Sequence, residues 1–135
     1  MELYRIEPGK KPSLLSPLVL AYVGDSVYEV YVRTRLIAEN PDLPAHKLHV
    51  LATGYVKAHA QSISMGALEG LLSFEEESIY KRGRNAKSPT VPKHAEIADY
   101  RRATGFEALV GWLFLEGQTD RLNEIMSLAY ENALK

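Results

Sequence analysis

Apolar residues recur every three or four positions along nearly the whole chain, which leaves little choice of fold class. This spacing places them on one face of a helix. No stretch alternates between apolar and polar residues over the length of a strand with turn residues at both ends. The pattern predicts an all-α protein of five to seven helices. The aromatic residues that fall at core spacing are predicted to pack inside it: Tyr22, Tyr28, Tyr31, Trp112 and Phe114.

Local signals mark several helix boundaries. Ser16 and Pro17 form a helix start, with a serine N-cap and a proline at the first helical position. Ser73 and Glu76 have the spacing of a capping box. Residues 82–93 are rich in Gly, Pro and basic residues and are expected to form a loop. The expected helices cover about 17–39, 45–65, 74–82, 94–115 and 120–134.

Length and composition limit the class of protein. The 135 residues are expected to form one domain, with residues 1–12 as an N-terminal extension. The chain has no cysteine, which excludes disulfides, zinc–thiolate sites and thiol nucleophiles. It shows no signal-peptide pattern, and Asp25 and Glu29 interrupt its longest apolar run. We therefore expect a cytoplasmic protein without a membrane span.

Positive charge is concentrated in one segment, although the net charge of the chain is −1. Residues 81–102 contain seven basic residues and two acidic ones. This asymmetry indicates an anion site, for which a polyphosphate is the commonest ligand. An exposed loop flanked by basic helix ends is the alternative explanation.

Two acidic residues, Asp25 and Glu107, stand among small or apolar residues on their own helix faces. Two acids held in this way could act as a general acid and base, or bind a hard divalent cation such as Mg²⁺. A cation beside a basic loop suits phosphodiester hydrolysis, because it activates water and offsets developing charge. The alternative is that each acid forms an ion pair with a basic residue of another helix, and the spacing alone favours this structural explanation.

Both acidic stretches resemble one enzyme family. "AYVGDSVYEVYV" resembles the signature helix of ribonuclease III, Glu-Phe-Leu-Gly-Asp-Ser/Ala-Val-Leu-Glu. "TGFEALVGWLFLEG" is similar to its second acidic helix, Asp-x-Phe-Glu-Ala-Leu-Ile-Gly-x-Leu-Tyr-Leu-Asp. The resemblance covers about Leu15 to Leu134. Together with "GRNAKS" and "PKHAEIADYRRATGFEAL", it points to the Mini-ribonuclease III branch, which has the catalytic domain without a double-stranded-RNA-binding domain.

The resemblance implies a divalent-metal-dependent endoribonuclease in which Asp25 and Glu107 are catalytic and bind Mg²⁺, with Mn²⁺ as a substitute. Two further acids of the family fall on Ala21 and Thr104, so each subunit keeps one carboxylate pair. The implied reaction cuts both strands of duplex RNA and leaves 5′-phosphate and 3′-hydroxyl ends. The implied substrate is a stem of precursor 23S ribosomal RNA in a bacterium. The lost acids favour an alternative, a catalytically weak or inactive duplex-RNA- or ribosome-binding module on the same fold.

The family also implies partners. We expect a homodimer whose two sites each cut one strand, and a large-subunit ribosomal protein as a further partner. Without an accessory domain, the basic segment must hold the duplex, through phosphates and 2′-hydroxyls. The residues expected to bind RNA are Lys81, Arg82, Arg84, Asn85, Lys87 and Lys93. A third alternative is a helical interaction domain in which Asp25 and Glu107 form interhelix ion pairs.

Overall fold

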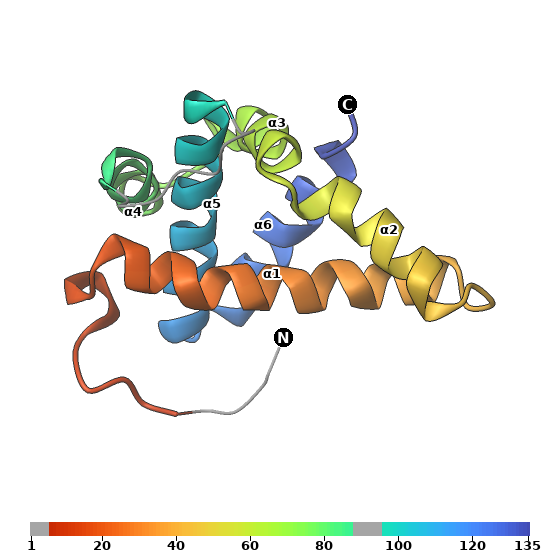
Figure 1. The fold of residues 1–135 in the computed structure, drawn as a ribbon. Helices are drawn as coiled ribbons and strands as arrows, with labels where there is room; N and C mark the ends of the chain where they lie inside the picture. The colour runs from red at the N-terminus through yellow and green to blue at the C-terminus, as the bar shows by residue number, and fades with distance from the viewer. Residues whose placement is uncertain (1–5, 88–95) are drawn as a thin grey trace.

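The computed structural model describes residues 6–87 and 96–135, and this part of the chain is entirely helical apart from its turns. The all-α prediction is confirmed. Figure 1 shows α1 crossing one side of the fold, with α5 running between α4 and the pair α3 and α6. The described elements are η1 (Pro12–Leu14), α1 (Pro17–Glu39), α2 (Ala45–Val56), α3 (Ala58–Leu68), α4 (Phe74–Asn85), α5 (Ile97–Leu115) and α6 (Thr119–Asn132).

The predicted helix starts are present. The Ser16 side chain accepts a hydrogen bond from the backbone N–H of Leu18, and Pro17 begins α1. At the start of α4, the Ser73 hydroxyl accepts from the N–H of Glu76, whose carboxylate accepts from the N–H of Ser73. Each contact satisfies a backbone donor that the first turn of a helix leaves unpaired.

The predicted helix over 45–65 is wrong, because the chain forms two helices there. Lys57 separates α2 from α3 with an extended backbone conformation, φ −64° and ψ 154°. No glycine or proline marks this break. Its cause is tertiary, since α2 packs mainly against α1 whereas α3 packs against α5 and α6. The chain therefore changes direction between two packing surfaces.

Helix α5 is the centre of the core and packs against α1, α3, α4 and α6 (Figure 1). Its Phe106 and Trp112 side chains are buried, and the Tyr28 ring of α1 meets Phe106 edge-on with ring centroids 4.9 Å apart. The prediction that Tyr22 packs in the core is wrong, because 82% of this residue is exposed. Tyr22 lies on the outer face of α1.

Pairs of glycines allow the helices to touch through their backbones. A Cβ atom on Gly24 of α1 would lie 1.8 Å from the carbonyl oxygen of Glu107. A Cβ on Gly111 of α5 would lie 1.9 Å from the carbonyl oxygen of Leu20. At the α4–α5 contact, a Cβ on Gly83 would lie 2.9 Å from the Cα of Gly105. The residues without side chains thus let both neighbouring helices approach the middle of α5 closely.

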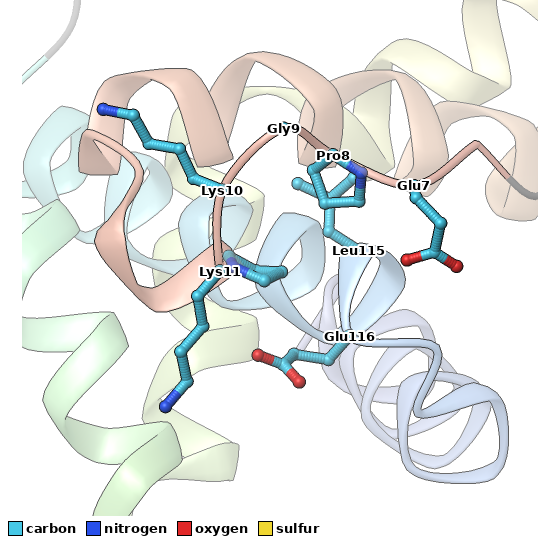
Figure 2. Close-up of a pocket in the computed structure, with 8 residues that line it drawn as sticks. Glu7, Pro8, Gly9, Lys10, Lys11, Leu115 and Glu116 are labelled. Atoms are coloured by element: carbon cyan, nitrogen blue, oxygen red, sulfur yellow. The ribbon is translucent and has the colours of Figure 1, made fainter.

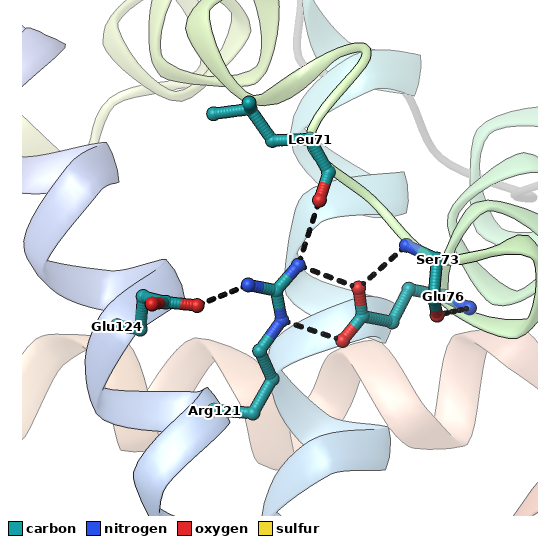
Figure 3. A network of polar contacts seen from close by, with 5 residues as sticks. All are labelled: Leu71, Ser73, Glu76, Arg121 and Glu124. Carbon is teal, nitrogen blue, oxygen red and sulfur yellow. Dashed lines mark hydrogen bonds and ion pairs between the residues drawn. The ribbon is translucent and has the colours of Figure 1, made fainter.

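An ion pair between the half-buried Arg121 and the buried Glu76 connects α6 to the start of α4 (Figure 3). The Arg121 guanidinium donates to both carboxylate oxygens of Glu76, at 2.8 Å each, and to the carbonyl of Leu71 at 2.8 Å. It also pairs with Glu124. The Arg121 guanidinium holds the pKa of the buried Glu76 carboxyl below its usual value. Glu76 therefore both caps α4 and anchors α6.

The N-terminal segment turns over the C-terminal end of α5 (Figure 2). Arg82 of α4 fixes it by donating to the carbonyls of Ser13 and Leu15, at 2.9 and 3.0 Å. Residues 7–12, with Leu115 and Glu116, line a pocket of about 430 Å³ that contains neither of the predicted catalytic acids. None of the described helices has the length and apolar character that crossing a membrane requires.

Candidate metal and nuclease site

Asp25 and Glu107 come together where α1 crosses α5. Asp25 directly follows Gly24, whose Cα faces the Glu107 backbone, so the glycine contact brings the two acids to the same place. Their carboxyl groups lie within hydrogen-bonding reach of each other. Asp25 is exposed, whereas Glu107 is half-buried. Two residues far apart in the chain thus form one carboxylate pair.

The environment of Glu107 disfavours its negative charge. Burial, and then the neighbouring charge of Asp25, raises the pKa of Glu107 to about 8. A hydrogen bond from the Gln61 amide to Glu107, with Nε2 3.3 Å from Oε2, acts in the opposite direction. Among the described residues, neither Asp25 nor Glu107 forms an ion pair with a basic side chain. The pair therefore carries negative charge that this part of the chain leaves uncompensated.

This donor set fits a hard divalent cation. Mg²⁺ prefers carboxylate oxygens and commonly takes only one or two of them from a protein. Within residues 6–87 and 96–135, no group of three or more His, Asp or Glu side chains could hold a metal. At the two positions where the resemblance implies further acids, Ala21 and Thr104 are buried, and the Thr104 hydroxyl donates to the Tyr100 carbonyl at 3.0 Å. Asp25 and Glu107 are thus the residues that would hold the ion.

Glu29, one turn after Asp25, does not join the pair. Its carboxylate accepts from Arg33 of the same helix at 2.9 Å. Gln61 does join it, although nothing in its spacing indicates this. Its neighbours one turn away are Lys57 and Ala58 before it and Ser64 and Met65 after it, so no apolar face marks Gln61 in the sequence.

The residues predicted to bind RNA have different surroundings on α4. Lys81 pairs with Glu77 at 2.7 Å, and both side chains are half exposed. Arg84 donates to the side-chain oxygen of Asn85 at 3.1 Å and lies over the Tyr80 ring. Lys87 is exposed just beyond the end of α4.

Arg82 and Lys93 are the two remaining residues that were predicted to bind RNA. The Arg82 guanidinium is already bonded to the carbonyls of Ser13 and Leu15. Lys93 lies outside the described residues. Among the predicted residues that the structure describes, Lys81, Arg84, Asn85 and Lys87 are therefore the ones not already bonded to the N-terminal segment.

We expect Glu107→Gln to stabilise the metal-free protein at alkaline pH. With its raised pKa, folded Glu107 retains a proton that the unfolded chain releases, so the free energy of unfolding falls as pH rises from about 4.5 to 8. Above that range the variant should be more stable than wild type by roughly 2–4 kcal/mol. Urea unfolding in EDTA at pH 5 and pH 9 measures the difference. A loss of stability at pH 9 would instead indicate a broken ion pair.

Comparisons with known proteins identify the family of this chain. Residues 18–118 match the model of the ribonuclease III domain. A Mini-ribonuclease 3 from Thermoanaerobacter is 50% identical over 87% of this chain and 82% of its own length. That of Clostridium tetani is 49% identical over 84% of this chain and 76% of its own.

A solved structure extends the comparison to the fold. The crystal structure of a Fusobacterium nucleatum protein superposes with a TM-score of 0.80 and 25% identity. The match covers 91% of this chain and 98% of that one. The chain therefore belongs to the ribonuclease III family of endoribonucleases, in which its relatives are Mini-ribonuclease 3 proteins.

Proposed function

We propose that this chain cuts both strands of duplex RNA, and that Asp25 and Glu107 bind the Mg²⁺ on which cleavage depends, with Mn²⁺ as a substitute. The observation that carries the proposal is the facing pair of carboxylates at the α1–α5 crossing. Their mutual repulsion and the burial of Glu107 leave a site that a divalent cation would stabilise. Family membership supplies the reaction class.

The cation and the residues of the chain have separate roles in the proposed reaction. When bound, the cation supplies an activated water and offsets negative charge on the phosphate. Asp25 and Glu107 would hold the ion, and the rigid α1–α5 contact maintains their separation. In hydrolysis the bond from phosphorus to the 3′-oxygen breaks and the water oxygen stays on the phosphate. The products therefore carry 5′-phosphate and 3′-hydroxyl ends.

The end of α4 is well placed to hold the duplex. Gly83 packs on Gly105, two residues before Glu107, so this part of α4 lies against the segment that carries the acid. Duplex RNA is bound mainly through its phosphates and 2′-hydroxyls, which basic and amide side chains can contact. We assign this role to Lys81, Arg84, Asn85 and Lys87, with Lys93 and Arg82 as the other candidates.

Replacing Lys81 and Lys87 together by alanine should weaken duplex-RNA binding and reduce its salt dependence. Each lost phosphate contact lowers the slope of log K against log salt by about one. Titration of a labelled duplex in EDTA at several salt concentrations measures both quantities. Lys47→Ala, which removes an exposed lysine from α2, is the matched control and should leave the slope unchanged. Equal slopes in all three proteins would exclude these lysines from the contact.

A homodimer is supported by the outer face of α1. Val19, Tyr22, Val30 and Ile37 are 49%, 82%, 43% and 54% exposed and recur at helical spacing. Burying this stripe against a second copy would remove apolar surface from water and bring two sites into one particle. Light scattering should give twice the mass of the chain, and a monomer at micromolar concentration would contradict the proposal.

The natural substrate that we propose is a stem of precursor 23S ribosomal RNA, with a large-subunit ribosomal protein as a further partner during ribosome assembly. The support is the similarity to Mini-ribonuclease 3 proteins of bacteria. Incubating the precursor transcript with this chain, and mapping both ends of every product, tests the assignment. Cleavage of unrelated duplexes with equal efficiency would contradict it.

A cleavage assay on a long duplex, with Mg²⁺ or with EDTA, tests the proposed function directly. We expect short duplex products with 5′-phosphates in Mg²⁺ and intact RNA in EDTA. Binding without cleavage in Mg²⁺ and in Mn²⁺ would support the alternative, a non-catalytic module, which the replacement of two family acids by Ala21 and Thr104 favours.

A further inference from the structure

Gln61 is a buried glutamine at the start of α3, and only 1% of it is exposed. Its Nε2 donates to the carbonyl of Val56 at 2.9 Å and to Oε2 of Glu107 at 3.3 Å. Its Oε1 has no hydrogen-bond partner among the described residues. An apolar side chain would fill this position without burying an unpaired oxygen. Packing alone therefore does not account for a glutamine here.

The break between α2 and α3 determines how this amide is oriented. Because Lys57 interrupts the helix, the Val56 carbonyl is not bonded to the backbone N–H four residues later, as it would be in a continuous helix. A carbonyl can only accept, so the NH₂ group of Gln61 must point toward Val56. The second N–H of the same NH₂ group is then directed at Glu107. The backbone thus decides which end of Gln61 meets the acid.

We infer that Gln61 is a positioning residue for cleavage, which holds Oε2 of Glu107 and leaves Oε1 free to bind the cation beside Asp25. The inference rests on the proposed function of Asp25 and Glu107. A lysine or arginine in place of Gln61 would cancel the charge of Glu107 and compete with the ion. A neutral donor orients the carboxylate without cancelling its charge, as the hydrogen-bond partners of metal ligands commonly do.

The test is Gln61→Met, which removes the donor and keeps an unbranched side chain of similar length. We expect kcat to fall about 10- to 100-fold and the Mg²⁺ concentration for half-maximal rate to rise. Duplex-RNA affinity in EDTA should stay within about twofold of wild type, because Gln61 is buried. Gln61→Asn keeps the amide but is one methylene shorter, so it cannot span both acceptors. Gln61→Asn should therefore show the same loss of kcat, and it takes the place of Gln61→Met in the test if that variant does not fold.

Ser64→Ala is the matched control. Ser64 is a buried polar residue on the same helix, and its hydroxyl donates to the carbonyl of Ala129 rather than to the acid pair. A loss confined to the Gln61 variants supports the inference. A folded Gln61→Met protein with unchanged kcat and Mg²⁺ dependence overturns it, as does an equal loss in Ser64→Ala.

Glu107→Gln, assayed beside these variants, distinguishes failure of the Gln61 role from failure of the proposed metal site. If Glu107→Gln loses cleavage and Gln61→Met keeps it, the positioning role is wrong and the proposed site stands. If Glu107→Gln keeps cleavage, the proposed site fails and the role of Gln61 fails with it.

Discussion

Replacing Asp25 by asparagine, or Glu107 by glutamine, is expected to reduce Mg²⁺-dependent cleavage of duplex RNA by about 10³-fold or more. Each amide keeps the shape of the side chain but removes the negative charge and an anionic oxygen that binds the ion. The site has one carboxylate pair, so the described residues offer no third acid to replace the lost ligand. Each substitution should therefore be nearly as damaging as the double variant.

Initial rates on a fixed duplex, over a range of Mg²⁺ concentrations, measure this effect. Glu29→Gln is the matched control, because Glu29 lies one turn from Asp25 and is paired with Arg33 instead. We expect it to keep wild-type activity. Both acid variants should remain folded and bind duplex RNA in EDTA. Undiminished Mg²⁺-dependent cutting by either of them would remove that residue from the catalytic site.

Gly24→Ala is expected to be the most damaging single methyl group that can be added at the site. Its Cβ would lie 1.8 Å from the Glu107 carbonyl oxygen and 2.8 Å from the backbone N of Gly111, whereas carbon–oxygen contacts are normally above about 3.3 Å. Both neighbours are backbone atoms, so α1 and α5 must separate. We expect a loss of about 3 kcal/mol in unfolding free energy and a melting temperature about 10 °C lower.

The same separation should lower cleavage in the fraction that remains folded, because it moves Asp25 away from Glu107. Thermal melting followed by circular dichroism, together with cleavage rates at 20 °C, measures both effects. Gly54→Ala is the control, since a Cβ there meets nothing within 4 Å. Alanine in that helix should be neutral or stabilise by up to about 1 kcal/mol. A Gly24→Ala protein as stable and active as wild type would show that the crossing is not tightly constrained.

Local chemistry explains which parts of the fold were predictable. Ser16 and Pro17 start α1, and Ser73 and Glu76 cap α4, because each signal acts within a single turn. The break at Lys57 has no such signal. It arises because α2 and α3 pack on different helices, and this depends on contacts between segments far apart in the chain. Tyr22 was misplaced for a related reason, since spacing does not show which side of α1 faces α5.

The site was predictable in part. Asp25 and Glu107 stand out in the sequence because charged residues are rare among small and apolar neighbours. Their closeness depends on the α1–α5 crossing, which no local pattern describes. Gln61 was missed because a glutamine in a helix is ordinary until its burial and its partners are known. The difference in burial between the two acids, and hence the raised pKa of Glu107, likewise required the assembled helices.

The glycine contact also limits how far α1 can slide along α5. The positions one turn away on the same helix faces carry side chains, among them Val27 and Tyr28 on α1 and Ala108 on α5, so the backbones can meet this closely only where Gly24 and Gly111 stand. A shift of one turn, about 5.4 Å along the axis, would bring a Cβ to the place where the two backbones now touch. Excluded volume at the glycines therefore contributes to setting the register of the two acids.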